Sequence, residues 1–407
     1  MEDRRFAAKI EQVLERFPWY GLLLGDRRTD QTLPPQPPLM TSDVLERFYY
    51  GMAQPFAGLS NVTCYRTSGT SSRHRKTIYY SEEDEQRYIR IKTELFSRTL
   101  APTGARTALS DMGTGHAAST ALDIFGQIGL EAESISFRRP ISEHLDRLKT
   151  LRPHVLYTMP SILDHLLFAS EEDPASYGIR HVVLVGEIAS PAWIHSVAER
   201  LKLAPRDITD TYGSIEIGTI AYYSHEHGRY LFADGIDAEG IPADELASDM
   251  APLQETDSVL VLTSYARELF PALRYVTYDI VRDLRPILVD GHWRQSFQAI
   301  VGRVGTELKH GEKISVYDIE EVVYRHLKEA HIRIRAVDNK LEVHVDSEER
   351  RPEVFKRIER ELADRIPEIG VMIRGGMLDA LRVIPAKVTY DGSVLKHKKI
   401  FRDGEAT

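Results

Sequence analysis

The sequence predicts an α/β protein with a large N-terminal domain and a small α+β C-terminal module. Short apolar runs alternate with helical patterns across residues 106–203, which is typical of a mostly parallel sheet covered by helices. After about Tyr222 the pattern changes to strands separated by polar turns, which indicates an antiparallel or barrel-like region. A third pattern, with two helices and a hairpin, follows Gly302. We therefore expect two domains, residues 1–302 and 303–407.

Length and composition agree with this division. The chain has 407 residues, and at about 150 residues per domain this favours two or three domains. Hydrophobic residues make up 42% and charged residues 28%, which is ordinary for a globular protein with a sizeable core. The formal net charge of −9 argues against nucleic acid as the main partner, because phosphate binding favours a basic surface.

Cysteine content and hydropathy exclude several classes of protein. Cys64 is the single cysteine, so the chain can form neither an internal disulfide framework nor a Cys-rich zinc site. The N-terminus is charged and amphipathic, without the apolar segment of a signal peptide. No run of 18 apolar residues occurs, so we expect no membrane contact and a cytoplasmic location.

The N-terminal part begins with an amphipathic helix over residues 4–16, indicated by apolar residues at helical spacing. A proline-rich link follows, and Thr41 or Ser42 is the expected N-cap of a short helix. Ser81 precedes an acidic stretch and is expected to cap the next helix, since acidic residues stabilise the first turn.

The middle and C-terminal elements follow from the same patterns. Apolar runs of buried-strand type predict strands at residues 106–111, 133–137, 153–159 and 181–187, with helices at 117–128 and 160–172. Further strands are expected at 257–265, 273–284 and 297–304. The C-terminal module is expected to contain a helix at 315–330, a hairpin at 332–346, a helix at 351–366 and a strand at 381–390.

A hydroxyl-rich turn is the most unusual local feature. Residues 67–73 contain five hydroxyl side chains, one glycine and one arginine, and further basic residues follow. Hydroxyls and backbone N–H groups on a glycine-containing turn can bind phosphate oxygens, and a nearby arginine adds charge-assisted hydrogen bonds. A Walker loop is excluded, because His74 stands where that motif needs its second glycine. The structural alternative is a solvated polar loop.

Five segments occur in the order found in one enzyme family. They are Ser68-Gly69-Thr70-Ser71-Ser72-Arg73-His74-Arg75, DTYGSIEIG at 210–218, LRYVTYDIVRDL at 273–284, GRVGTELKHGEKIS at 302–315 and KKIFR at 398–402. They resemble the phosphate loop, the Tyr-Gly-x-Thr-Glu, Arg-Tyr-x-Thr-Gly-Asp and Gly-Arg-x-Asp segments, and the terminal Gly-Lys-Ile-x-Arg of the acyl-adenylate-forming ligases. Residues 151–166 and 184–193 are similar to the phenylacetate–CoA ligase branch.

The resemblance implies a fold and a reaction. The implied fold is a large N-terminal adenylation core of two stacked, mostly parallel sheets plus a distorted β-barrel, with a small mobile C-terminal domain. In the implied reaction a carboxylate attacks the α-phosphate of ATP with Mg²⁺ present, and a thiol then displaces AMP. An aryl acid is favoured. The thiol belongs to coenzyme A or to a separate phosphopantetheinyl carrier protein, as in short ligases of siderophore and antibiotic pathways.

The resemblance also implies roles for individual residues. Phosphate contacts are implied for Ser68, Gly69, Thr70, Ser71 and Arg75, and Mg²⁺ binding for Glu216. The nucleotide site would also include Gly186, Glu187, Tyr212, Gly213 and Ser214, with Asp279 at the ribose and Arg303 at ribose or phosphate. The acyl pocket would include Gly113, Gly115 and His116.

The C-terminal module is implied to supply the remaining groups. Lys399 is the expected adenylation residue, because a lysine there neutralises both reacting anions, with Lys396 and Lys398 as neighbouring alternatives. Rotation about Gly305 is expected to replace Lys399 with the loop that contains Lys309. Other interpretations remain open: an acyl-CoA ligase of phenylacetate type, a nucleotidyl transferase, and a non-catalytic nucleotide-binding protein of the same fold.

Overall fold

The computed structural model describes residues 2–24, 37–52, 54–66, 76–112, 116–246, 252–304, 316–337, 340–366, 369, 373, 378–387 and 400–402. The chain divides into two compact units. Unit 1 contains residues 1–96 and 212–307, and unit 2 contains residues 97–211 and 308–407. Each is described by itself. The expected division between residues 1–302 and 303–407 stays a prediction.

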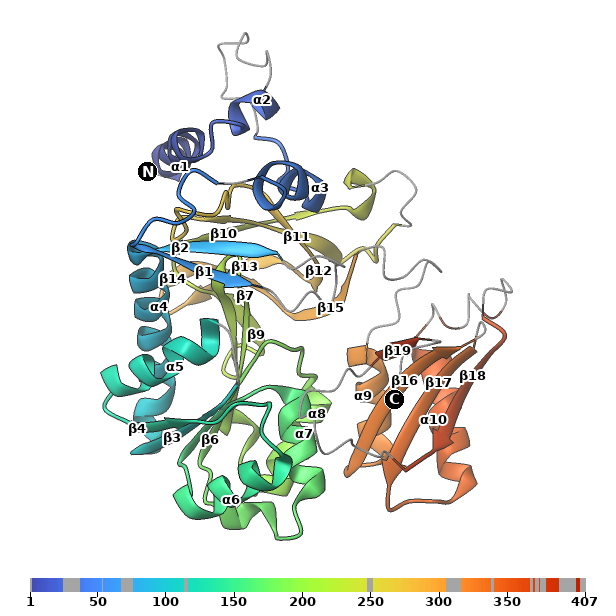
Figure 1. Cartoon of the computed structure of the whole chain (residues 1–407). Helices are drawn as coiled ribbons and strands as arrows, with labels where there is room; N and C mark the ends of the chain where they lie inside the picture. Colours follow the sequence, from blue (N-terminus) through green and yellow to red (C-terminus); the bar gives the residue numbers. More distant parts are fainter. Residues whose placement is uncertain are drawn as a thin grey trace. The chain divides into compact units, whose positions relative to one another are not determined.

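Most helices of unit 1 come from the N-terminal third of the chain (Figure 1). They are α1 (Glu2–Arg16), α2 (Tyr20–Leu24), α3 (Ser42–Leu45), the π-helical turn η2 (Glu46–Tyr50) and α4 (Glu82–Leu100), which continues into unit 2, with the short turn η6 (Ala243–Glu245) later. The predicted caps are confirmed. The Thr41 hydroxyl accepts a hydrogen bond from the Val44 N–H at 3.4 Å, and the Ser81 hydroxyl accepts one from the Asp84 N–H at 3.0 Å.

Strands of unit 1 form antiparallel ladders. The strands β1 (Val62–Arg66) and β2 (Thr77–Ser81) pair with each other, and residues 67–75 between them lie outside the described residues. A second sheet has the order β10 (Ile236–Ile241), β11 (Asp257–Ser264), β12 (Tyr275–Arg282) and β15 (Ala299–Arg303). A third set of antiparallel strands has the order β13 (Arg285–Val289), β14 (His292–Phe297), β9 (Arg229–Phe232) and β8 (Gly218–Ser224). The expected strands at 257–265, 273–284 and 297–304 are thereby confirmed.

The core of unit 1 joins these layers. Helices α1 and α2 lie over the sheet that contains β11 and β12 (Figure 1), and their apolar faces pack into one cluster with it. Val13 of α1, Phe17 directly after α1, Ile78 of β2 and Leu260 and Leu262 of β11 are all buried in this cluster. The amphipathic pattern of residues 4–16 thus has the physical reason expected of it, since one helical face is removed from water.

Unit 2 contains the parallel sheet. Its order is β4 (Glu131–Ser134), β3 (Thr107–Asp111), β5 (Val155–Thr158), β6 (His181–Val185) and β7 (Ile208–Ser214), and β7 runs on into unit 1. The accompanying helices are α5 (His116–Gln127), α6 (Ile141–Leu151), α7 (Pro160–Ala169) and α8 (Pro191–Leu201), with short turns η3 (Ala101–Thr103), η4 (Pro174–Tyr177) and η5 (Pro205–Asp207). The chain order reverses direction between β3 and β5, and such a switch point is where ligands bind in open α/β sheets.

The C-terminal module of unit 2 is a mixed sheet with two helices on it (Figure 1). Its strand order is β18 (Ala380–Pro385), β17 (Lys340–Ser347), β16 (Ala330–Val337) and β19 (Ile400–Arg402), and its helices are α9 (Val316–His326) and α10 (Pro352–Arg365). The predicted helices and hairpin are confirmed, whereas the expected turn residues Asp338 and Asn339 lie outside the described residues. The predicted α/β class with a small α+β module is confirmed.

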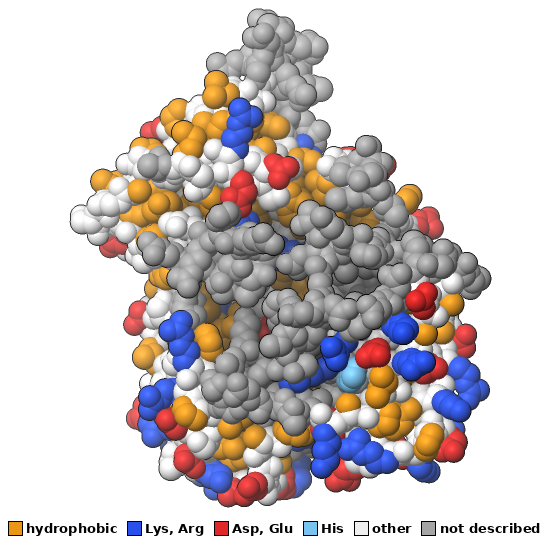
Figure 2. Space-filling view, turned by 45° about the vertical axis from the view of Figure 1, so that its right-hand side comes forward, with side chains coloured by type: hydrophobic (Ala, Val, Ile, Leu, Met, Phe, Trp, Pro, Cys, Tyr) orange, Lys and Arg blue, Asp and Glu red, His pale blue; other side chains and the backbone are white. Residues whose placement is uncertain are grey.

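The surface carries mixed charge. On the face drawn in Figure 2, Lys and Arg side chains are interspersed with Asp and Glu side chains. Among the helices that the structure describes, none combines the length and the apolar character that crossing a bilayer requires.

A lysine lies inside the core of unit 1. Lys9 on α1 is 3% exposed, and its Nζ donates hydrogen bonds to the Arg267 carbonyl at 2.6 Å and to Gln12 Oε1 at 3.0 Å. Burial lowers the pKa of Lys9 to about 7. In the unfolded chain this pKa is about 10.4, so between these two values the unfolded chain holds a proton that the folded chain has released.

Stability of unit 1 should therefore rise as pH increases from about 7 to 10, with a Lys9 contribution of up to about 1.4 kcal/mol per pH unit. The Lys9→Met variant should have a correspondingly flatter dependence of unfolding midpoint on pH, measured by thermal and urea denaturation. Arg4→Met, which removes an exposed charge from the same helix, is the control and should keep the wild-type slope. Equal slopes for wild type and Lys9→Met would contradict the assignment.

Candidate functional site

The predicted site residues are distributed over described and undescribed parts of the chain. Those outside the described residues are Ser68, Gly69, Thr70, Ser71, Arg75, Gly113, Gly115, Gly305, Lys309 and Lys399, together with Lys396 and Lys398. Their roles stay predictions. Unit 1 contains Tyr212, Gly213, Ser214, Glu216, Asp279 and Arg303, and unit 2 contains His116, Gly186 and Glu187.

Asp279 and Arg303 lie opposite each other on the antiparallel strands β12 and β15. Arg303 Nη1 lies 3.8 Å from Asp279 Oδ1, and the arginine side chain is 64% exposed. An ion pair this long and this exposed contributes little to stability, because water screens it. The guanidinium is therefore available to a second anion while it remains beside the carboxylate.

Tyr212 contacts the same carboxylate from β7. Its hydroxyl donates a hydrogen bond to Asp279 Oδ2 at 2.5 Å, and its ring packs edge-on against Phe297 with 6.1 Å between ring centroids. Burial, and then the negative charge of Asp279, raise the pKa of Tyr212 well above its usual value. The phenol is therefore a protonated donor at neutral pH. Its expected position beside adenine stays a prediction.

The ionisation of Asp279 reflects opposing effects. Burial raises the pKa of Asp279, while the Arg303 charge and the hydrogen bond from Tyr212 act in the opposite direction. The net direction is upward, so this carboxylate becomes protonated at a higher pH than an exposed aspartate. When ionised, it can accept hydrogen bonds from hydroxyl groups, which is the chemistry a ribose diol requires.

Backbone strain occurs next to this carboxylate. Tyr278 has φ of 64°, a left-handed conformation that favours glycine, and it stands where the family segment Arg-Tyr-x-Thr-Gly-Asp has its glycine. The Tyr278 hydroxyl accepts a hydrogen bond from the Ser42 N–H at 2.8 Å and lies 2.9 Å from the Ser42 hydroxyl. Contacts with the N-terminal segment thus hold a tyrosine in a conformation that glycine adopts without cost.

Glu216 lies in the tight turn between β7 and β8. A Cβ atom at Gly213 would come within 2.6 Å of the Gly218 carbonyl oxygen, so this turn requires glycine. The Ser214 hydroxyl accepts a hydrogen bond from the Ile217 N–H at 3.2 Å, which closes the turn. The motif residues around Glu216 therefore have a conformational reason for their identity.

The pKa of Tyr275 depends on the charges of Glu216, Asp279 and Arg303. Burial, and then the negative charges of Glu216 and Asp279, raise the pKa of Tyr275, whereas the positive charge of Arg303 lowers it. Burial and the charge of Glu216 likewise raise the pKa of Tyr50. Electrostatic coupling of this kind falls off with distance, so Tyr275 lies within reach of the charges of all three side chains in unit 1.

The donor set fits a cation that is shared with a polyphosphate. Among the described residues no group of three or more His, Cys, Asp or Glu side chains gathers to form a complete metal site. Mg²⁺ bound to nucleotide phosphates needs only one or two protein carboxylates, and carboxylate oxygen is its preferred ligand. Glu216 has a carboxylate of this kind, and it is the residue predicted to hold the ion.

The predicted residues of unit 2 have well-defined surroundings. Gly186 follows β6 with φ of 79°, and a Cβ there would lie 3.4 Å from Met159 Cε. The Glu187 carboxylate accepts hydrogen bonds from the N–H and the hydroxyl of Ser161, both at 2.8 Å, at the start of α7. A carboxylate at a helix N-terminus is stabilised by the helix dipole, so this contact has a structural reason. Their expected role at adenine stays a prediction.

His116, the residue predicted for the acyl pocket, begins α5 and is 5% exposed. Its expected role stays a prediction.

A buried pair at the switch point, formed by Asp111 and His144, was not predicted from the sequence. At the end of β3, Asp111 Oδ2 lies 2.9 Å from Nδ1 of His144 on α6, and both side chains are fully buried. Burial raises the pKa of Asp111, opposed by His144. The sequence could have indicated Asp111, because an aspartate at the end of a buried strand is unusual. It could not have indicated His144, which approaches Asp111 only through tertiary packing.

Comparisons with known proteins assign the chain to a family. A family model described as the fumarate–diaminopropanoate ligase C-terminal domain matches residues 309–389. Fumarate–(S)-2,3-diaminopropanoate ligase from Enterobacter agglomerans is 34% identical over 382 residues, which cover 94% of this chain and 95% of that protein. Phenylacetate-coenzyme A ligase from Thermus thermophilus is 25% identical over 305 residues, covering 69% of this chain and 64% of that protein.

A solved structure of a ligase has a similar fold. The structure of 2-hydroxyisobutyryl-CoA ligase in its postadenylation state matches with a TM-score of 0.70 and 15% identity, over 98% of this chain and 88% of that one. At this identity the likeness concerns the fold alone. The sequence relatives carry the assignment further: this chain is an adenylate-forming ligase and belongs to the family that includes fumarate–(S)-2,3-diaminopropanoate ligase.

Proposed function

We propose that this chain activates a small carboxylic acid with ATP and Mg²⁺ and passes the acyl group to the amine of an amino acid. The observation that carries the proposal is 34% identity over nearly the full length of a ligase named for fumarate and diaminopropanoate. The matched C-terminal domain supports it, because residues 309–389 lie in the module expected to act in the second half-reaction.

In the first half-reaction the carboxylate oxygen bonds to the α-phosphorus of ATP, and pyrophosphate leaves. We assign the ribose hydroxyls to Asp279, supported by the Tyr212 hydroxyl that holds its carboxylate in place, and a phosphate oxygen to the exposed Arg303. The resemblance assigns the β- and γ-phosphates to Ser68, Thr70, Ser71 and Arg75. Bound Mg²⁺ supplies charge neutralisation beside Glu216.

In the second half-reaction the amine nitrogen bonds to the acyl carbon, the bond to AMP breaks, and the amine loses a proton. A thiol acceptor, coenzyme A or a carrier protein, is the second candidate, and the coverage by phenylacetate-coenzyme A ligase favours it. The aryl acid expected from the sequence remains a hypothesis beside fumarate. The two candidates differ in the product, an amide or a thioester.

The deciding experiment measures AMP release and product mass. Purified protein with ATP and Mg²⁺ receives fumarate or an aryl acid, with 2,3-diaminopropanoate, coenzyme A or no acceptor. We expect acid-dependent pyrophosphate exchange and an amide that forms only when the amine is present. A thioester without any amide would establish the thiol acceptor, and ATP binding without exchange for any acid would establish a non-catalytic protein.

Asp279→Asn should raise the KM for ATP by roughly 10- to 100-fold, since a hydrogen bond to a charged group contributes about 1.5–3 kcal/mol. Tyr212→Phe, which leaves the carboxylate in place, should have a smaller effect. The measurement is pyrophosphate exchange at varied ATP concentration. Asp257→Asn is the matched control, because Asp257 pairs with Arg282 in the same sheet. An equal increase in the control would assign the effect to the sheet.

Lys399→Ala should lower adenylation by on the order of 100-fold or more, because the loss removes charge stabilisation at the reacting phosphate. Transfer from a chemically prepared acyl-adenylate should survive in this variant. Lys396→Ala and Lys398→Ala are measured in parallel, and a collapse in one of these alone would move the assignment to that lysine. Loss of both half-reactions in Lys399→Ala would indicate a structural role.

A further inference from the structure

A buried arginine with no assigned role lies between β11 and β12. Arg267 is 2% exposed, which is exceptional for a side chain that remains charged at every physiological pH. Its guanidinium lies 3.6 Å from the centre of the Tyr80 ring and forms an ion pair with Asp84 at 2.5 Å. Removing such a charge from water is costly, so the fold must compensate it at this place.

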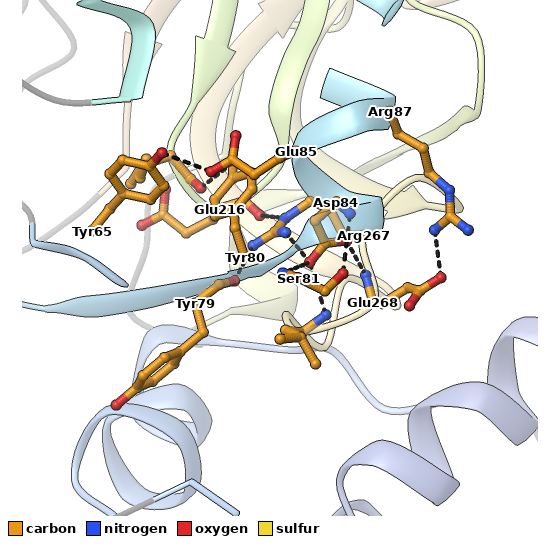
Figure 3. A network of polar contacts seen from close by, with 12 residues as sticks. Tyr65, Tyr79, Tyr80, Ser81, Asp84, Glu85, Arg87, Glu216, Arg267 and Glu268 are labelled. Carbon is orange, nitrogen blue, oxygen red and sulfur yellow. Dashed lines mark hydrogen bonds and ion pairs between the residues drawn. The ribbon is translucent and has the colours of Figure 1, made fainter. Parts of the chain in front are cut away.

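The guanidinium donates to two backbone segments. Its Nε donates to the Glu216 carbonyl at 2.8 Å, and its Nη2 donates to the Tyr79 carbonyl at 2.9 Å (Figure 3). The Tyr80 hydroxyl adds a hydrogen bond to the Ile215 carbonyl at 2.8 Å. One planar group and one phenol thus connect the turn that contains Glu216 to strand β2.

Asp84 holds the guanidinium in place. Its carboxylate accepts hydrogen bonds from the N–H groups of Glu268 at 2.6 Å and Leu269 at 3.1 Å, the residues that follow Arg267. It also accepts one from the Ser81 N–H at 3.3 Å. Figure 3 shows Ser81, Asp84 and Arg267 converging at the end of β2 and the start of α4. The position of the arginine is therefore fixed by the backbone on both sides of the ion pair.

One connected segment contains Glu216, and the other is strand β2. Strand β2 leads out of the hydroxyl-rich turn, and Glu216 is the proposed Mg²⁺ ligand. We propose that Arg267 is a positioning residue for adenylation, which fixes the backbone of the proposed Mg²⁺ ligand Glu216 relative to strand β2. This inference rests on the proposed function. Lysine cannot replace Arg267 in this role, because a single ammonium group lacks the planar, forked guanidinium that reaches two carbonyls and a carboxylate.

The test uses a variant designed to fold. Arg267→Met alone leaves Asp84 as a buried unpaired charge, which destabilises the protein. The double variant Arg267→Met with Asp84→Asn removes both charges and keeps an acceptor for the Glu268 N–H. Its matched control is Arg282→Met with Asp257→Asn, which removes another arginine–aspartate pair that lies in the β11–β12 sheet. Thermal unfolding verifies that both are folded.

Three readouts separate positioning from general damage. In the double variant we expect the adenylation rate to fall on the order of 100-fold, as for a misplacement of about 1 Å. The Mg²⁺ concentration that gives half-maximal ATP binding, measured by calorimetry, should rise, and transfer from a prepared acyl-adenylate should stay within about threefold of wild type. The control should retain all three wild-type values.

Unchanged Mg²⁺-dependent ATP binding in the folded double variant would overturn the inference, and so would an equal loss of acyl transfer. Failure of the proposed function gives a different pattern. In that case the wild type forms no acyl-adenylate from any acid or transfers no acyl group, while the calorimetric comparison of ATP binding still decides the role of Arg267.

Discussion

The ion pair between Arg267 and Asp84 is the interaction on which unit 1 depends. It lies away from water, where an uncompensated charge costs several kcal/mol. The fold compensates it with backbone carbonyls around the guanidinium and backbone N–H groups around the carboxylate. Because these partners come from β2, the β7–β8 turn and the segment after Arg267, the pair fixes three parts of the chain at once.

A second pair of opposite charges in the same unit has different properties. Arg303 and Asp279 also face each other, yet their charged atoms are 3.8 Å apart and the arginine is mostly exposed. A tight buried pair specifies structure, whereas a loose exposed pair leaves both groups able to bind something else. In one unit the chain thus contains an arginine that is fully committed to the fold and another that remains free for an anionic ligand.

Much of the fold was predictable because it follows from local periodicity. The parallel strands β3, β5 and β6 are short apolar runs, and α1, α9 and α10 repeat apolar residues at helical spacing. Helix α6 was not predicted. One of its buried residues is His144, a polar residue that a hydrophobic pattern does not place in the core. It is buried because its ring nitrogen forms a hydrogen bond with Asp111. Its burial therefore depends on a contact that no local pattern contains.

In the candidate site too, some residues follow from local sequence patterns and others depend on tertiary contacts. Site roles for Tyr212, Glu216, Asp279 and Arg303 were proposed because these residues stand in short segments with recognisable neighbours. In unit 1 the side chains of Tyr212 and Arg303 both lie against Asp279. Arg267 and Asp84 were not predicted, since each is an ordinary charged residue until the fold pairs them. Sequence reasoning thus proposed the groups that would touch the nucleotide and missed the pair that holds the backbone of the Glu216 turn.

The left-handed tyrosine at position 278 has an evolutionary consequence. Such a residue costs about 1–2 kcal/mol relative to glycine, and the hydrogen bonds with Ser42 offset part of that cost. Selection therefore acts on the two positions together. In descendants and cousins of this chain, a bulky residue at 278 should be accompanied by a hydroxyl at 42, and glycine at 278 should release position 42 to vary freely.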